Sequence, residues 1–197
     1  MFTGIVEELG RVAAFDGARL RIAASIVLED AHIGDSIAAN GCCLTVVDMS
    51  GGGDQGWWEA DISQETLART SLRGIGVGSP LNLERSVRLA DRLSGHLVQG
   101  HVDGVGEVLQ PVPDLLVRIP AGLMRYVVEK GSITVDGVSL TVVNPTADTF
   151  TVAIIPHTAA MTNLGAKQPG DSVNIEVDVL AKYVERLLAG HVEGPSS

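Results

Sequence analysis

The sequence is poor in aromatic residues, in cysteine and in positive charge, and each shortage excludes something. Aromatic residues make up 4% of the 197 residues, and the only two cysteines, Cys42 and Cys43, are neighbours. Neighbouring residues of a strand point to opposite faces and a disulfide between them is strained, so a disulfide framework is excluded. Two adjacent thiols without further Cys or His at ligand spacing also exclude a zinc site, and we expect no bound metal.

Basic residues are outnumbered by acidic ones. The 14 Lys and Arg stand against 24 Asp and Glu, which gives a formal net charge of −10. Because phosphate binding requires clustered basic side chains, nucleic acid is excluded as a partner. No stretch reaches the roughly 18 apolar residues of a membrane span, and residues 1–4 lack the basic start of a signal peptide. These absences predict a cytoplasmic protein that binds neither nucleic acid nor membrane.

The most informative feature that is present is an internal repeat. Residues 41–47 match residues 137–143 at an offset of 96, and residues 82–84 match residues 174–176 at an offset of 92. A period of this length is too long for a solenoid or a propeller blade, so it indicates a duplicated domain. We predict one domain over residues 1–90, a second over residues 91–178, and a separate C-terminal segment over residues 179–197.

Each half has the pattern of short strands separated by turns. Residues 18–23 and 115–119 alternate between apolar and polar, and three further segments are rich in β-branched residues. Those three are residues 41–48, 137–144 and 149–155. About six short strands per half favour a small closed barrel or a sandwich. Short helical pieces are expected at residues 65–72, 122–129 and 157–164.

The C-terminal segment has a helical pattern that the first half lacks. Apolar side chains recur at the spacing of one helix face, namely Leu180, Tyr183, Val184, Leu187 and Leu188. Such a stripe packs either on the helix's own barrel or on another subunit, and the sequence leaves both open.

Five segments in order resemble the riboflavin synthase family. They are MFTGIVE (1–7), NGCCLTV (40–46), SGHLVQGHVDG (94–104), KGSITVDGVSLT (130–141) and NIEVD (174–178). The resemblance implies a mainly β protein of two homologous six-stranded Greek-key β-barrels, followed by a C-terminal α-helix that assembles a homotrimer. It implies no metal and no redox cofactor, and it allows association with lumazine synthase.

The resemblance also implies the reaction. The substrate is 6,7-dimethyl-8-ribityllumazine, one molecule per barrel, at a site between the N-terminal barrel of one subunit and the C-terminal barrel of another. One lumazine gives a four-carbon unit to the other, in a dismutation that yields riboflavin and 5-amino-6-ribitylamino-pyrimidinedione.

By the same resemblance, the catalytic residues are Cys43, His101, Ser139, Thr141 and Asp178. Cys43, His101, Ser139 and Thr141 also contact the substrate. The other residues expected to bind it are Phe2, Gly4, Ile5, Val6, Leu44, Thr45, Asp61, Ile62, Ser63, Gln64, Glu65, Thr66, Gly100, Val102, Lys130, Leu140, Ile155, Pro156, His157, Thr158, Ala159 and Ala160.

Several of these residues have a plainer interpretation. Cys43 is either a nucleophile or a polar contact, since a thiolate needs a lowered pKa that sequence does not reveal. Asp178 suits a helix N-cap, Lys130 suits a solvated turn, and His96 suits a structural histidine. His157 stands where the first half has Glu65, which leaves that contact open.

Two rival functions remain at this stage. A non-catalytic lumazine- or flavin-binding protein of the same fold would lose the catalytic side chains, whereas this chain keeps Cys43, His101, Lys130, Ser139, Thr141 and Asp178. A purely structural double barrel would not need polar Ser and Thr residues repeated at matching positions.

Overall fold

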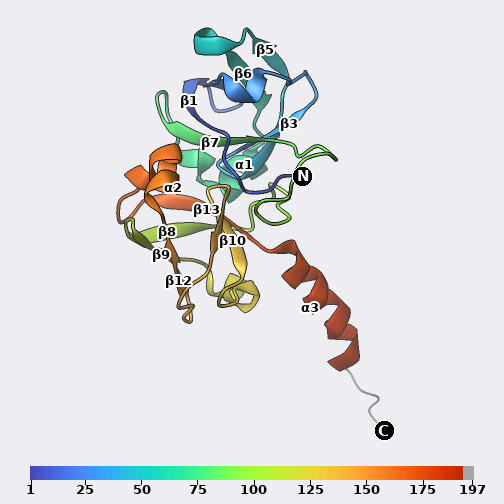
Figure 1. Cartoon of the computed structure of the whole chain (residues 1–197), viewed down its shortest axis with the longest axis vertical. Coiled ribbons are helices and arrows are strands. Elements are labelled where there is room, and N and C mark those ends of the chain that lie inside the picture. The colour runs from blue at the N-terminus through green and yellow to red at the C-terminus, as the bar shows by residue number, and fades with distance from the viewer. Residues whose placement is uncertain (193–197) are drawn as a thin grey trace.

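The computed structural model describes residues 1–192 and contains two antiparallel sheets, one from each half of the chain (Figure 1). The first sheet has seven strands, arranged in the order β4-β3-β7-β1-β2-β6-β5. Their bounds are β1 (Glu8–Phe15), β2 (Arg19–Ala23), β3 (Ser36–Ala39), β4 (Cys42–Thr45), β5 (Asp48–Ser50), β6 (Trp57–Asp61) and β7 (Pro80–Arg85).

The second sheet has six strands in the order β11-β10-β13-β8-β9-β12. Strand for strand this is the order of the first sheet without β5, so the repeat in the sequence is a repeat of topology. The bounds are β8 (Gly104–Gln110), β9 (Asp114–Arg118), β10 (Ser132–Val135), β11 (Val138–Thr141), β12 (Thr149–Ala153) and β13 (Ser172–Val177).

Each sheet closes on itself through the segment that follows its first edge strand. In the first half this segment is β5, which comes two residues after β4 and pairs with β6 at the opposite edge. In the second half Val143, just after β11, pairs with Thr151 of β12. The expected pair of Greek-key barrels is therefore confirmed, with one extra short strand in the first.

The alternation of the sequence explains which side of each strand is buried. In β2, Leu20 and Ile22 are fully buried, whereas Arg19 between the turn and Leu20 is exposed. Leu115 and Val117 of β9 are likewise fully buried. Each barrel thus encloses its own apolar core, which packs side chains from all of its strands.

Two hairpins carry the turn residues that their geometry requires. Asn40 and Gly41 join β3 to β4, and Asp136 and Gly137 join β10 to β11. All four residues have positive φ angles, of 46, 74, 46 and 80°. This is the backbone of a type I′ turn, for which Asn-Gly and Asp-Gly are the preferred pairs.

Short helices lie where the sequence predicts them. Helix α1 (Gln64–Arg69) leads into the 3-10 helix η3 (Ser71–Gly74), and α2 (Pro156–Met161) leads into η5 (Asn163–Ala166). The segment expected at 122–129 is a 3-10 helix, η4 (Ala121–Tyr126). Two more 3-10 turns, η1 (Ile26–Leu28) and η2 (Gly53–Gln55), occur in the first half.

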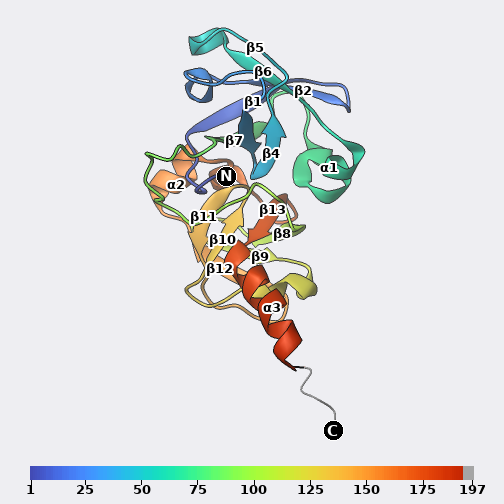
Figure 2. The same cartoon turned by 90° about the vertical axis from the view of Figure 1, so that its right-hand side faces the viewer.

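The C-terminal helix α3 (Val179–Val192) extends away from both sheets (Figures 1 and 2). Its predicted apolar stripe is exposed: Leu180, Tyr183, Val184, Leu187 and Leu188 each keep 54–72% of their surface. The stripe is therefore not buried against the chain's own barrels. No helix among residues 1–192 is long and apolar enough to cross a membrane.

Candidate active site

The N-terminal segment of each half crosses over to the other half. Phe2 pairs with Val98 through two backbone hydrogen bonds, of 2.8 and 3.1 Å, and both side chains are buried. The N-terminus consequently lies between the two sheets (Figure 2). From this crossing, residues 3–6 continue toward the second barrel and residues 99–102 toward the first.

The two crossing segments dock on equivalent strands. The carbonyl of Gly4 accepts the N–H of Ser139 in β11 at 2.7 Å, and the carbonyl of Gly100 accepts the N–H of Cys43 in β4 at 2.8 Å. Both glycines have a φ of +77°, and a Cβ on either would lie within 2.7 Å of the Cβ of the residue it faces. Only glycine allows this close approach, so the repeated Gly4 and Gly100 bring each segment against a catalytic candidate.

A first candidate site lies on the second barrel. Val6, Leu140 and Ala159, which come from the N-terminal segment, β11 and α2, all pack against the core of that barrel. Ile5 and Thr141 are exposed there and Ser139 is half-buried. The expected binding residues at 4–6 and 139–141 meet through the hydrogen bond of Gly4 with Ser139, although they are far apart in the sequence, and those at 155–160 belong to the same barrel. We refer to these three segments as the C-cleft.

The equivalent N-cleft lies on the first barrel. Val102 and Leu67 pack against the first core, beside the buried Leu44 of β4. Ser63 caps α1 by accepting the N–H of Thr66 at 3.0 Å, and the two hydroxyls are 2.9 Å apart. We refer to residues 43–45, 61–66 and 100–102 as the N-cleft, in which Ile62 is buried and Asp61, Gln64, Glu65 and His101 are exposed.

Some expected contacts of the N-cleft are already engaged in ion pairs. Asp61 lies 2.7 Å from Arg19, and Glu65 lies 2.9 Å from Arg69 within α1. In the C-cleft Pro156 begins α2, and His157 is exposed with no ion pair among the described residues. The two clefts are therefore built from equivalent backbone segments but differ in the charge of their side chains.

The C-cleft contains a contact that sequence reasoning missed. Nδ1 of His96 lies 2.7 Å from Oγ of Ser139. His96 is buried at 8% exposure, and its Nε2 has no hydrogen-bond partner among the described residues. Asp178 lies near enough to act on the histidine electrostatically. A histidine facing a serine hydroxyl can move a proton at that hydroxyl.

The protonation state of His96 follows from its burial. Removal from water holds the pKa of His96 below its ordinary value of 6.5, and the nearby Asp178 opposes that shift only in part. His96 is therefore neutral at pH 7 and can exchange a proton with Ser139. Asp178 also accepts the N–H of Leu180 at 2.9 Å, so the N-cap interpretation of the sequence is confirmed alongside its position near His96.

The adjacent cysteines have different surroundings. Cys42 is buried, and burial raises the pKa of its thiol to about 12, so it stays protonated. Cys43 is half-buried and faces Gly100 of the crossing segment. Of the two thiols, only Cys43 is placed to meet a ligand in the N-cleft.

Two of the expected binding residues have unusual positions. Phe2 has no exposed surface, because its ring packs with Ala38 and Val98 between the two barrels. Lys130 is exposed on a turn with a φ of +64°, and its N–H donates to the carbonyl of Val142. The structure thus gives Phe2 a packing role and leaves the charge of Lys130 at the surface.

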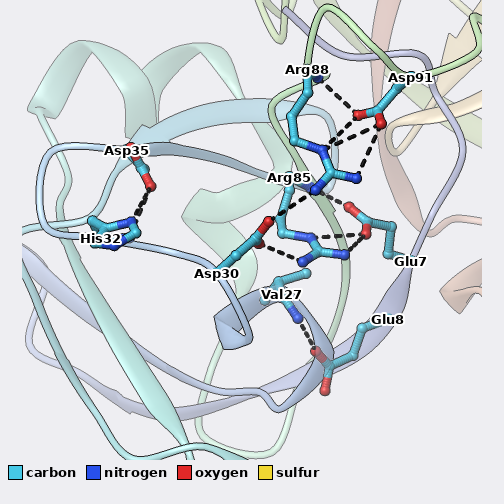
Figure 3. Close-up of polar contacts among 9 residues, drawn as sticks. All are labelled: Glu7, Glu8, Val27, Asp30, His32, Asp35, Arg85, Arg88 and Asp91. Atoms are coloured by element: carbon cyan, nitrogen blue, oxygen red, sulfur yellow. Dashed lines mark hydrogen bonds and ion pairs between the residues drawn. The ribbon is translucent and has the colours of Figure 1, made fainter.

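A cavity of about 510 Å³ lies beside the N-terminal crossing segment, and its lining includes Thr3, Ile5 and Glu7 of that segment. Figure 3 shows the charged network on its wall, in which Arg85 pairs with both Glu7 and Asp30. Arg88 pairs with Asp30 and Asp91 in the same network. Because these arginines are already paired, the network is better suited to holding the segment at Glu7 than to binding a further anion. Among residues 1–192 no three His, Cys, Asp or Glu side chains are placed to hold a metal ion.

Comparison with known proteins gives the site a context. A family model described as a lumazine binding domain matches this chain twice, over residues 3–86 and 99–178. Each match contains one of the two barrels described above. The family model thus recognises the same duplication that the offsets of 96 and 92 indicate.

Named relatives cover almost the whole chain. A protein of Mycobacterium tuberculosis named riboflavin synthase is 52% identical, over 95% of this chain and 98% of that protein. Riboflavin synthases of Bacillus subtilis and Schizosaccharomyces pombe are 43% and 39% identical, over 95% and 98% of this chain respectively.

Solved structures are similar in fold as well. Crystal structures of LumP complexed with 6,7-dimethyl-8-(1'-D-ribityl) lumazine and with riboflavin match with TM-scores of 0.76 and 0.77. Both are 28% identical to this chain and cover 90% of it and 99% of LumP.

Proposed function

This chain belongs to the lumazine-binding family and, within it, to the riboflavin synthases, and from that premise we propose how its two clefts act. Each cleft binds one 6,7-dimethyl-8-ribityllumazine. A four-carbon unit passes from one lumazine to the other, which gives riboflavin and 5-amino-6-ribitylamino-pyrimidinedione. The atoms of two substrate molecules account for both products, so the reaction consumes no other reagent.

The observation that carries this proposal is the presence of two equivalent clefts in one chain. The docking of Gly4 on Ser139 repeats in the docking of Gly100 on Cys43, with almost the same hydrogen-bond length. A reaction between two identical substrate molecules requires two sites that recognise the same ring. A duplicated barrel supplies them.

The required chemistry is mainly positioning. The 7-methyl group of the lumazine is acidic because its anion delocalises into an electron-poor ring. Holding two reactants in an aligned geometry can supply about 7–11 kcal/mol of the barrier. Hydrogen-bond donors aimed at the developing anion lower the barrier further.

The side chains of the two clefts suit different parts of this task. In the C-cleft Ser139, which lies at hydrogen-bond distance from neutral His96, exchanges a proton with the bound ring, and Thr141 contacts the same ring. Asp178 acts on His96 electrostatically. In the N-cleft Cys43 and Thr45 contact the second ring, and His101 stabilises charge or transfers a proton. Lys130, exposed on the second barrel, contacts substrate at the boundary between subunits.

The N-cleft and C-cleft of one chain lie on separate barrels, so we place the reacting pair between two subunits. The exposed stripe of α3 supplies the apolar surface for a homotrimer, as isolated surface stripes of this kind mark association sites. The acidic charge and the absence of basic patches suit a cytoplasmic enzyme. Association with lumazine synthase would supply the substrate directly.

A carrier that binds lumazine without converting it is the alternative function. LumP, which resembles this chain in fold, was crystallised with lumazine and with riboflavin. The proton-transfer pair of His96 and Ser139 favours catalysis, since a carrier needs no buried neutral histidine against a serine hydroxyl.

One incubation separates the two functions. The purified chain is mixed with the ribityl-lumazine and its absorbance is followed, with Ser139→Ala as the matched control. Catalysis predicts growth of the flavin spectrum with the wild type and little with the variant. A stable bound lumazine spectrum with no flavin would establish a carrier instead.

A further inference from the structure

Two buried glutamates at equivalent positions of the barrels hold the crossing segments in place. The carboxylate of Glu84 in β7 accepts the N–H of Thr3 at 2.6 Å, the Thr3 hydroxyl at 2.8 Å and the N–H of Gly4 at 3.0 Å. The carboxylate of Glu176 in β13 accepts the N–H of Gln99 at 2.7 Å and of His101 at 2.9 Å. Each glutamate belongs to one barrel and binds the segment that docks on the other.

The positions of both carboxylates are unfavourable for the stability of the fold. Glu84 and Glu176 are 6% and 3% exposed, and no cation pairs with either among the described residues. Burial accordingly raises the pKa of both carboxyls, against the effect of the N–H donors. A buried charge without a counter-ion destabilises the folded state. What the position gains is an acceptor whose two oxygens bind two backbone N–H groups of the crossing segment.

A second anchor fixes the far end of each segment. Glu7 accepts the N–H of Arg85, the residue after Glu84, at 2.7 Å and pairs with its guanidinium (Figure 3). Asp103 accepts the N–H of Val177, the residue after Glu176, at 3.0 Å, and its other oxygen pairs with Lys182 of α3. The segments at 3–7 and 99–103 are thus each held at both ends by one strand.

The equivalent segments carry different residues between their anchors. The position that is Ile5 in the N-terminal segment is His101 in the other, and both are exposed. Glu84 therefore places an apolar side chain at the C-cleft, whereas Glu176 places a titratable one at the N-cleft. We propose that Glu176 is a positioning residue for the reaction, which acts by holding His101 against the N-cleft through the N–H groups of Gln99 and His101, and that Glu84 has the corresponding role for ligand binding at Ile5. This proposal rests on the proposed function.

The test uses Glu176→Gln, with Glu84→Gln as its matched control. Each substitution keeps the size and one acceptor oxygen, but it turns an amide NH₂ toward a backbone N–H. A misplacement of about 1 Å at a reacting group costs roughly 100-fold in rate. We expect Glu176→Gln to lower kcat by that factor with little change in KM. Glu84→Gln releases the other segment, which docks on Ser139 and does not carry His101, so its effect should not depend on His101.

A double-variant comparison shows whether Glu176 acts through His101. If it does, Glu176→Gln combined with His101→Gln is no slower than His101→Gln alone, whereas Glu84→Gln combined with His101→Gln shows the product of the two separate effects. A combined loss for Glu176→Gln and His101→Gln equal to the product of the separate losses would overturn the proposal.

Hydrogen exchange of single amides gives a readout that needs no turnover. Glu176→Gln should lose protection at Gln99 and His101 and keep it at Thr3 and Gly4, and Glu84→Gln should do the reverse. Unchanged protection at Gln99 and His101 would also overturn the proposal. If the wild-type chain makes no riboflavin but the two variants show this exchange pattern, the proposed function is refuted. The placement of the segments by the two glutamates would still be established. If the Gln variant does not fold, Glu176→Asp, which keeps the charge but shortens its reach, takes its place in each comparison.

Discussion

Gly41 and Gly137 lie back to back where the two barrels meet. A Cβ on Gly41 would be 2.7 Å from the backbone nitrogen of Gly137, and a Cβ on Gly137 would be 2.6 Å from that of Gly41. The two residues are equivalent in the repeat, so this reciprocal contact marks an approximate two-fold axis between the barrels. Around it, Asn82 Nδ2 donates to the carbonyl of Asp136 and Asn174 Nδ2 donates to that of Asn40, both at 2.8 Å.

Replacing either glycine by alanine should therefore destabilise the chain. The left-handed backbone alone costs a non-glycine residue about 1–2 kcal/mol, and the overlap with a backbone that cannot move adds to it. Gly78→Ala is the control, since Gly78 has a φ of +88° with nothing within 4 Å of the added Cβ. Urea unfolding should show a larger loss for Gly41→Ala than for Gly78→Ala. Equal losses would mean that the two barrels can move apart at no cost.

The crossing segments determine whether an isolated first barrel can bind a ligand. The repeat by itself suggests that a fragment ending near Leu89 folds and binds lumazine or riboflavin. In the structure, however, the N-cleft includes Gly100, His101 and Val102, which such a fragment lacks. We expect the fragment of residues 1–90 to bind only as a dimer, in which Gly4 of one copy docks on Cys43 of the other.

Ultracentrifugation together with quenching of riboflavin fluorescence tests this expectation. Binding should rise with the fraction of dimer, and a fragment of residues 7–90, without the docking segment, should neither dimerise nor bind. A monomer that binds riboflavin would show that the crossing segment is dispensable for the N-cleft.

The sequence predicts the frame of this protein better than its site. Periodicity in β2 and β9 and the turn pairs Asn40-Gly41 and Asp136-Gly137 are local signals, and the structure follows them. The crossing of the two segments left no local signal, because Gly4 and Gly100 are far in sequence from Ser139 and Cys43, the residues on which they dock. The repeat did pair Glu84 with Glu176, yet it could not say that both are buried acceptors.

His96 illustrates the same limit within the site. It lies 43 residues from Ser139 in the sequence, so no spacing rule connects them. A lone histidine is also compatible with a structural role, and its partner becomes visible only when the loop at residues 94–98 is placed beside β11. The signal that could have singled it out is its position within the resembling segment at 94–104.

The contact between His96 and Ser139 predicts a pH dependence. Neutral His96 can take up the proton of the Ser139 hydroxyl, and the protonated form cannot. Because burial lowers the pKa of His96, the active form persists below pH 6.5, and kcat should fall only as the pH drops through that lowered pKa. His96→Gln should remove this acid limb.

The contribution of Ser139 to kcat is measured at pH 7.5, where His96 is neutral. Loss of one donor to a developing anion costs about 100- to 1000-fold in kcat, and we expect Ser139→Ala to lose activity in that range while its affinity for riboflavin changes less. His101→Gln should show the same preference for kcat over binding. An acid limb that survives in His96→Gln would have to come from another group.

The exposed stripe of α3 predicts how the chain assembles. Glutamate at Tyr183 and Leu187, which are 61% and 72% exposed, should lower the oligomeric state by removing apolar contact area. Substitution rather than truncation keeps the ion pair of Lys182 with Asp103 and the N-cap at Asp178. Arg186→Glu, on another face, is the control. Light scattering that finds the same oligomer in every variant would show that the barrels assemble without the helix.

Mixing two inactive variants tests whether one reaction site draws on two chains. The N-cleft variant carries Cys43→Ala and Thr45→Ala, and the C-cleft variant carries Ser139→Ala. If each site joins the N-cleft of one subunit to the C-cleft of the next, every mixed trimer has one junction at which both clefts are intact, or about one site in three. Activity should appear when the variants are unfolded and refolded together, and it should not appear when they are refolded apart and then combined. Differently tagged chains verify that mixed trimers have formed. Mixed trimers that stay inactive would place both reacting lumazines within one chain. A site shared by two chains would be active at the junction where both clefts are intact.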